Sequence, residues 1–244
     1  MAENLIFITP TGDRPLTFAL CQRWIEKQTL QPDQWIIVDD GKVPIKPFIS
    51  LREIRYLRRE SQSDDPKHTL LVNLRLALPY VKGDKIIVIE DDDYYAPKYA
   101  ETMAAKLDEH EVVGIYDSRY YYLPTCANCR AGNKGHASLA QTAFRKSFLP
   151  DFKELVRSKT GALDMMLWRV VNKAKRGALF LDDKEPLYVG MKGMPGRRGK
   201  GGSHTANSWR YNLSSLDTSQ ELLRRWIPDE EDFNIYLDLI KGKK

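Results

Sequence analysis

Cysteine is scarce in this chain of 244 residues. There are three, Cys21, Cys126 and Cys129, and a sparse, odd-numbered set argues against the disulfide framework of small secreted domains. Cys126 and Cys129 form a CxxC pair, but a structural zinc site needs four ligands and no second pair follows. We interpret the cysteines as ordinary thiols.

Long hydrophobic runs are also missing. No apolar stretch is long enough to cross a bilayer, and the first ten residues, MAENLIFITP, lack the basic region, apolar core and cleavage site of a secretory signal. We therefore expect a cytoplasmic protein with no membrane insertion. The apolar content of 42% and charged content of 29% are typical of a globular chain with a substantial core.

Acidic residues are absent from one basic segment, residues 191–210. It contains Lys192, Arg197, Arg198, Lys200 and Arg210, and its charge of +5 equals the net charge of the whole chain. The remaining residues therefore sum to zero. Charge concentrated in this way predicts a local anion-binding site.

Short apolar segments alternate with amphipathic ones through the first half of the chain. Strands are expected at residues 5–9, 34–38, 54–57, 85–90 and 112–116, and helices at 13–27, 68–81 and 97–110. This alternation predicts an α/β fold with a mostly parallel sheet and helices on both faces. The second half is less regular, with helices expected at 161–173, 219–226 and 230–240 and short strands at 138–144, 179–181 and 187–189.

The segment KIIVIEDDDYYAP, residues 85–97, ends a buried strand in three aspartates, Asp91, Asp92 and Asp93. Adjacent carboxylates at the end of a buried strand repel one another and lose hydration. A divalent cation such as Mg²⁺ or Mn²⁺ would compensate both costs, since hard ions take oxygen ligands. The alternative is a solvated acidic turn before the next helix. The buried strand directly upstream favours the metal site.

Polar side chains follow two further strands. Thr9, Pro10 and Thr11 follow the first, and Asp39 and Asp40 follow the second. Ligands of such sheets bind beyond the carboxyl ends of the strands. The sequence thus predicts that three strand ends direct polar groups into one crevice.

These motifs together resemble the metal-dependent glycosyltransferases of the GT-A fold, most closely family 2 and its small soluble, phage-type members. The resemblance covers residue 5 to about residue 171 and is strongest in the first hundred. It depends on LIFIT with the following Pro10 and Thr11, IIVDDG at 36–41, the block 73–97 with Asn73 and a DxD-type motif, and Asp164 at a helix start. It implies a Rossmann-like GT-A sheet with a small irregular C-terminal acceptor or lid region.

The resemblance also implies roles for individual residues. Asp164 would be the catalytic base, although Leu163 stands where the family usually has Glu. Asp91 and Asp93 would form the DxD pair that binds the metal. The expected donor-binding residues are Thr9, Pro10, Thr11, Arg14, Asp39, Asp40, Asn73, Asp91 and Asp92.

The basic segment has several possible roles. One hypothesis makes it a flexible lid that binds the donor diphosphate through Arg197, Arg198 and Lys200, with His204 as a further metal ligand. In the second, the same cations grip a polyanionic acceptor such as DNA. The third alternative is a solvated loop. We divide the chain accordingly into a catalytic domain (1–190), this loop (191–210) and C-terminal helices packed on the same domain (211–244).

The resemblance thus implies a glycosyltransferase that moves a hexosyl or pentosyl group from a nucleoside diphosphate, UDP in particular, with Mn²⁺ or Mg²⁺ as cofactor. The expected acceptor is a hydroxyl, on a modified base in DNA or on another polyanion. Two alternatives remain open: a nucleotidyltransferase of similar fold, which would release pyrophosphate, and a basic nucleic-acid-binding module without catalysis.

Overall fold

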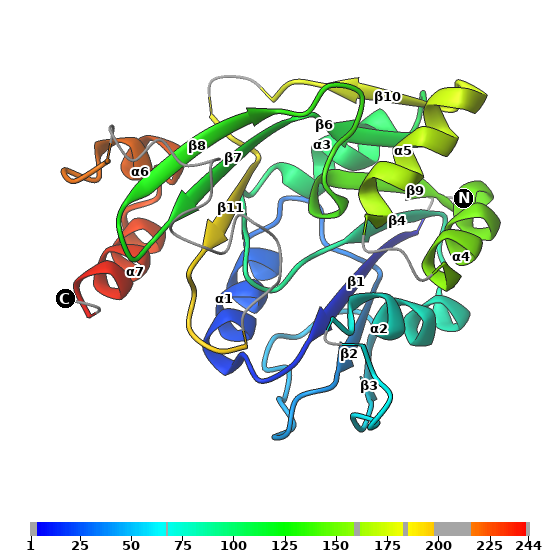
Figure 1. Ribbon diagram of the computed structural model, residues 1–244, viewed down its shortest axis with the longest axis horizontal. Coiled ribbons are helices and arrows are strands. Elements are labelled where there is room, and N and C mark those ends of the chain that lie inside the picture. Colours follow the sequence, from blue (N-terminus) through cyan, green and yellow to red (C-terminus); the bar gives the residue numbers. More distant parts are fainter. Residues whose placement is uncertain (1–3, 67, 159–161, 183–184, 198–215, 243–244) are drawn as a thin grey trace.

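A seven-stranded sheet forms the centre of the computed structural model, which describes residues 4–66, 68–158, 162–182, 185–197 and 216–242 (Figure 1). The strand order is β10-β6-β9-β4-β1-β2-β3. Only β9 runs antiparallel to its neighbours, β4 and β6, so the predicted mostly parallel sheet is confirmed. The strands are β1 (Leu5–Thr11), β2 (Gln34–Asp39), β3 (Ile54–Arg58), β4 (Lys85–Val88), β6 (Val112–Ile115), β9 (Thr142–Arg145) and β10 (Gly177–Phe180).

Helices cover both faces of this sheet, as the sequence predicted. Alternate residues of β1 point to opposite faces: Phe7 packs in the hydrophobic cluster that includes Trp24, whereas Ile8 packs in the cluster that includes Phe152. Each fully buried side chain of this size contributes about 1.5–3 kcal/mol. The first face carries α1 (Pro15–Glu26) and α3 (Tyr99–Lys106), and the second carries α2 (Leu70–Ala77), α4 (Leu149–Arg157) and α5 (Leu163–Ala174).

A second, four-stranded sheet has the order β5-β11-β7-β8. Its strands are β5 (Tyr94–Tyr95), β7 (Asp117–Tyr122), β8 (Ala127–Gly132) and β11 (Tyr188–Lys192). Strand β11 runs parallel to β7 and antiparallel to β5. Because β5 begins at Tyr94, directly after the three aspartates, this pairing brings the side chains of β11 next to the acidic turn.

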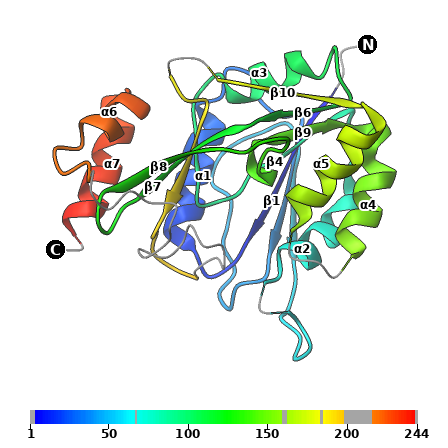
Figure 2. The same ribbon diagram turned by 45° about the horizontal axis from the view of Figure 1, so that its top comes forward.

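The C-terminal helices α6 (Glu221–Trp226) and α7 (Glu230–Lys241) lie at the end of the molecule away from α4 and α5 (Figure 2). Helix α7 packs on α1: the rings of Tyr236 and Trp24 stack with centroids 5.9 Å apart. Buried Asp232 accepts hydrogen bonds from Arg23 and Lys27, at 2.8 and 2.5 Å. No helix among the described residues is long and apolar enough to cross a membrane.

Several expected boundaries moved. The helix expected at 68–81 ends at Ala77 and continues as a 3₁₀ turn, Leu78–Tyr80, since Pro79 has no amide hydrogen to continue the α-helical bonding. The strand expected at 138–144 begins only at Thr142, because Leu139–Gln141 forms a 3₁₀ helix. A further 3₁₀ helix, Lys146–Phe148, precedes α4. Helix α4 and strands β5, β7 and β8 were not predicted.

Candidate active site

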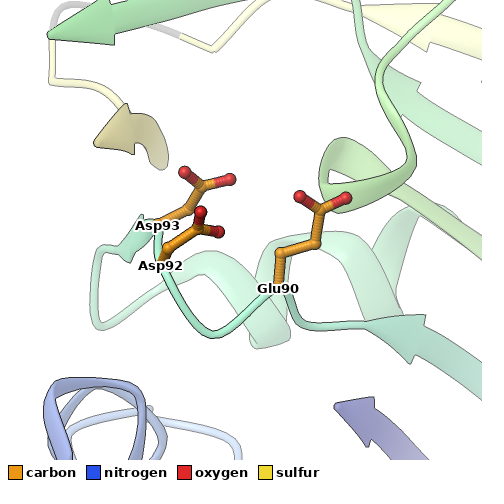
Figure 3. A group of neighbouring side chains, drawn as sticks. All are labelled: Glu90, Asp92 and Asp93. Carbon is orange, nitrogen blue, oxygen red and sulfur yellow. The ribbon is translucent and has the colours of Figure 1, made fainter. Parts of the chain in front are cut away.

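Three carboxylates project into a common space from the turn that links β4 to β5 (Figure 3). One oxygen each from Glu90, Asp92 and Asp93 lies within 4.8 Å of the other two. Such a set of hard oxygen donors fits Mg²⁺ or Mn²⁺.

Burial makes the charged forms of these acids costly. It raises the pKa of Glu90 to about 8, and the negative charges of Asp93 and Asp92 add to the shift. Burial likewise raises the pKa of Asp93 to about 6. A bound divalent cation would favour the ionised forms and relieve the repulsion among them.

Strand β11 provides two partners for Asp93. The Tyr188 hydroxyl donates to one carboxylate oxygen at 2.5 Å and the Lys192 ammonium donates to the other at 2.8 Å. Tyr188 and Lys192 are four residues apart on a strand and therefore point to the same face. Lys192 was counted in the sequence only as part of the basic segment, but its side chain is 5% exposed. Burial lowers the pKa of this ammonium, but the surrounding carboxylates raise it by a larger amount. The net pKa is therefore above its usual value, and Lys192 is charged.

A second group of contacts links the ends of β1 and β4. Thr11 donates to Asp91 at 2.6 Å. Arg14, directly before α1, forms ion pairs with Asp91 at 3.0 Å and with Asp92 at 2.8 Å. Asp91 therefore faces β1, while Asp92 and Asp93 share their space with Glu90. The structure brings Asp93 into the three-carboxylate group and leaves Asp91 outside it; the metal-binding role of Asp91 stays a prediction.

The end of β2 carries the second pair of acids. Asp39 accepts the amides of Gly41 at 2.9 Å and Ile45 at 3.0 Å, and the Tyr56 hydroxyl at 2.5 Å. These bonds hold the loop after β2 in one shape. The Asp39 carboxylate is thus an organiser of the predicted nucleotide pocket.

Asp40 connects three separate segments. It pairs with Arg59 of the segment after β3 and with Arg197 of the basic segment. Arg59 also donates to Asn73 of α2 at 2.9 Å. Burial raises the pKa of Asp40, but hydrogen bonds from Thr69, Arg197 and Arg59 hold it below its usual value, so this carboxylate is ionised at neutral pH.

The other predicted residues have different surroundings. Thr9 lies inside the sheet, where its hydroxyl accepts the indole N–H of Trp35 at 2.9 Å, and Pro10 lies beside Val38 in the parallel register. Asp164 is in the first turn of α5, where among the described residues it accepts only the amide of Met165. The predicted ligands Arg198, Lys200 and His204 lie outside the described residues.

Gly12 lies where these segments meet. A Cβ atom there would lie 2.2 Å from an oxygen of Asp40 and 2.8 Å from the backbone nitrogen of Gly41. We expect Gly12→Ala to force the loops of β1 and β2 apart and to weaken binding at the predicted UDP site at least about tenfold, an effect of 1.4 kcal/mol or more. Calorimetric titration with UDP measures it. Gly132→Ala is the control, because nothing lies within 4 Å of its added Cβ; equal UDP affinity of the two variants would contradict the prediction.

Sequence reasoning missed Glu90, Tyr188, Arg58 and Arg59. Glu90 had a detectable signal, since it interrupts an apolar strand immediately before the aspartates. Arg58, which forms an ion pair with Asp39 at 3.3 Å, is the last residue of β3 and Arg59 follows it; the carboxyl end of β3 lies at the same sheet edge as that of β2. Tyr188 had no local signal, because its contact depends on the position of β11 in the second sheet.

Comparisons with known proteins agree with this architecture. The family model described as Glycosyl transferase family 2 matches residues 7–164. S. aureus TarS in complex with UDP-GlcNAc is similar with a TM-score of 0.54 and 16% identity, over 98% of this chain and 66% of that one. The complex of the same protein with UDP has a TM-score of 0.52 and 15% identity, and the match covers 77% of this chain and 60% of that one.

A third similar structure is the mannosyltransferase PcManGT from Pyrobaculum calidifontis in complex with GDP-Man and Mn²⁺. It has a TM-score of 0.53 and 13% identity, over 80% of this chain and 58% of that one. The chain thus spans less than two thirds of the length of these structures. No curated protein matches the sequence. At these identities the structural similarity shows the fold.

Proposed function

The chain belongs to glycosyltransferase family 2, and from this premise we propose that it transfers a sugar from a UDP-linked donor to an acceptor hydroxyl with Mn²⁺ or Mg²⁺ as cofactor. The observation that carries the proposal is the group of Glu90, Asp92 and Asp93 at the carboxyl edge of the sheet. That edge is where open α/β sheets bind their ligands.

We infer that Glu90, Asp92 and Asp93 hold the divalent ion. When bound, the ion supplies Lewis-acid stabilisation for charge that develops on the departing diphosphate. The presence of Mn²⁺ with a nucleotide sugar in the similar mannosyltransferase supports this assignment. Asp91 accepts the Thr11 hydroxyl and forms an ion pair with Arg14, and its role as a further metal ligand stays a prediction.

The chain's own cations complete the donor site in this proposal. Arg14 and Arg197, with side chains 17% and 34% exposed, are accessible at the edges of the acidic groups and would bind the diphosphate. Asp39 and its partner Tyr56 would line the base and ribose pocket. The proposed contribution of Arg198, Lys200 and His204 extends the same diphosphate site.

For the acceptor side we propose Asp164 as the general base and DNA or another polyanion as the acceptor. Asp164 lies in the first turn of α5, and the exposed cations Arg169 and Lys173 lie further along the same helix. The net charge of +5 favours a polyanionic partner. An electrophoretic binding assay at several salt concentrations tests this part, since binding to DNA phosphates weakens steeply with salt.

A thermal-shift panel tests the donor and the cofactor. We expect UDP with Mn²⁺, at about 100 times the dissociation constant, to add about 2.7 kcal/mol and raise the melting temperature by about 5–10 °C. UMP with Mn²⁺ is the matched control and should give a smaller shift, because it lacks the second phosphate that the ion and the arginines would bind. UDP stabilisation that is unchanged by EDTA would contradict a metal-dependent site.

Incubation with UDP-GlcNAc should release UDP, whereas a nucleotidyltransferase would release pyrophosphate from a nucleoside triphosphate.

A further inference from the structure

Both carboxylate oxygens of Asp93 accept a hydrogen bond. Asp93 is one of the three carboxylates that fit a divalent ion, yet one of its oxygens accepts the Tyr188 hydroxyl and the other accepts the Lys192 ammonium. A hydroxyl can share a carboxylate oxygen with a metal ion. An ammonium 2.8 Å from that oxygen competes with the ion for the same negative charge.

Lys192 is held in this position by the packing of β11. Gly190, between Tyr188 and Lys192, lies against the ring of Tyr120, where an added Cβ would be 2.4 Å from a ring carbon. The Lys192 ammonium is 5.8 Å from the centre of the same ring. Strand β11 thus packs closely against β7, and the side chain of Lys192 points toward Asp93.

The charges of the turn reinforce this arrangement. Asp93 acts most strongly on Lys192, followed by Asp92 and Glu90, which are the other two members of the three-carboxylate group. One buried ammonium therefore offsets part of the repulsion that a divalent ion would remove. The four-carbon stem of lysine allows the ammonium to withdraw without movement of the strand.

We propose that Lys192 is a built-in counter-ion of the metal site: its ammonium neutralises Asp93 when the ion is not bound and must leave Asp93 for the ion to bind. The inference rests on the proposed function, in that the three carboxylates bind a divalent cation. It goes further by assigning to Lys192 the role of lowering the affinity of this site for the divalent ion. Tyr188, which contacts the same carboxylate without a charge, does not compete in this way.

Calorimetric titration of the nucleotide-free protein with Mn²⁺ tests the proposal. We expect Lys192→Met to bind Mn²⁺ at least about tenfold more tightly than the wild type, because a nearby positive charge is removed from a poorly solvated site. Lys192→Arg keeps the charge and should bind within about threefold of the wild type, and so should Tyr188→Phe, which removes a neutral donor to the same carboxylate. Lys192→Met should also be less stable without Mn²⁺ and gain more in melting temperature from Mn²⁺.

A second neutral variant, Lys192→Gln, can still donate a hydrogen bond to Asp93 and serves if Lys192→Met does not fold. The wild type gives an independent measurement: acetylation of Lys192, followed by mass spectrometry, should be faster with Mn²⁺ than with EDTA, because the amine has left its buried ion pair. The two neutral variants and the labelling all test whether Mn²⁺ displaces the Lys192 ammonium from Asp93.

The outcomes separate this inference from the function on which it rests. Equal or weaker Mn²⁺ binding by the neutral variants, with binding by the wild type intact, overturns the counter-ion role and leaves the metal site standing. Labelling that is unaffected by Mn²⁺ also overturns it. If neither the wild type nor the neutral variants bind Mn²⁺, the metal assignment itself fails. Binding by the neutral variants alone would give the strongest support.

Discussion

Asp93→Asn is expected to release UDP from UDP-GlcNAc about 10²–10³-fold more slowly than the wild type. Metal-assisted stabilisation of a leaving group is worth several kcal/mol, and each 1.36 kcal/mol changes the rate tenfold. An amide oxygen at this position is a much weaker ligand for a hard cation than a carboxylate. The loss should therefore appear both in turnover and in Mn²⁺ affinity.

Asparagine is preferred to alanine here because of the contacts of Asp93. The one oxygen of an Asn side chain can still accept the hydrogen bond from Lys192, while its amide N–H can donate to the Tyr188 hydroxyl, and the charge of Lys192 remains compensated by Asp92 and Glu90. The variant should fold, and circular dichroism checks this. Asp64→Asn removes one negative charge from an exposed loop and is the matched control. Near-normal turnover and Mn²⁺ affinity in Asp93→Asn would remove the basis of the proposed function.

The part of this site that depends on strand ends could be predicted from the sequence. Apolar runs marked the strands, and parallel topology places their carboxyl ends at one edge. That argument alone is enough to bring Thr11, Asp40 and Asp91 to one edge of the sheet, where Thr11 contacts both aspartates. It succeeds because each strand end is a local feature, and the sheet supplies the long-range order.

The partners of the aspartates could not be predicted in the same way. Lys192 is 99 residues from Asp93 in the sequence, and its position depends on the register of β11 with β5 and β7. Strand β8 lacks an apolar pattern and forms because β7 pairs with it. Helix α4, in contrast, had a detectable signal, because Pro150 lies in its first turn and its buried residues Leu149, Phe152, Leu155 and Val156 have helical spacing.

The spacing of the acidic motif gives the wrong grouping of its carboxylates when the motif is treated as part of a strand. A strand continuing through the aspartates would place Asp91 and Asp93 on one side and Glu90 and Asp92 on the other. The strand instead ends at Val88. In the turn that follows, the period of two no longer applies, so Glu90 and Asp92 join Asp93 while Asp91 turns toward Thr11.

Asp164→Asn is expected to separate donor binding from turnover. If Asp164 removes the proton of the acceptor hydroxyl, its loss should lower the turnover number about 10²–10⁴-fold, the usual contribution of a general base. UDP affinity should stay unchanged, because no hydrogen bond or ion pair among the described residues connects Asp164 with Asp39, Asp40 or the acidic turn. UDP titration and UDP release from UDP-GlcNAc, with water as the acceptor, measure the two quantities.

The substitution is conservative for the fold, so a loss of activity can be assigned to chemistry. The Asp164 carboxylate accepts the amide of Met165 at 2.8 Å in the first turn of α5, and an Asn oxygen can accept the same bond. Glu221→Gln is the control, since Glu221 is an exposed carboxylate in the first turn of another helix, α6. Turnover within about threefold of the wild type would show that a general-base contribution is absent at Asp164. A parallel loss of UDP affinity would instead place this residue in the donor site.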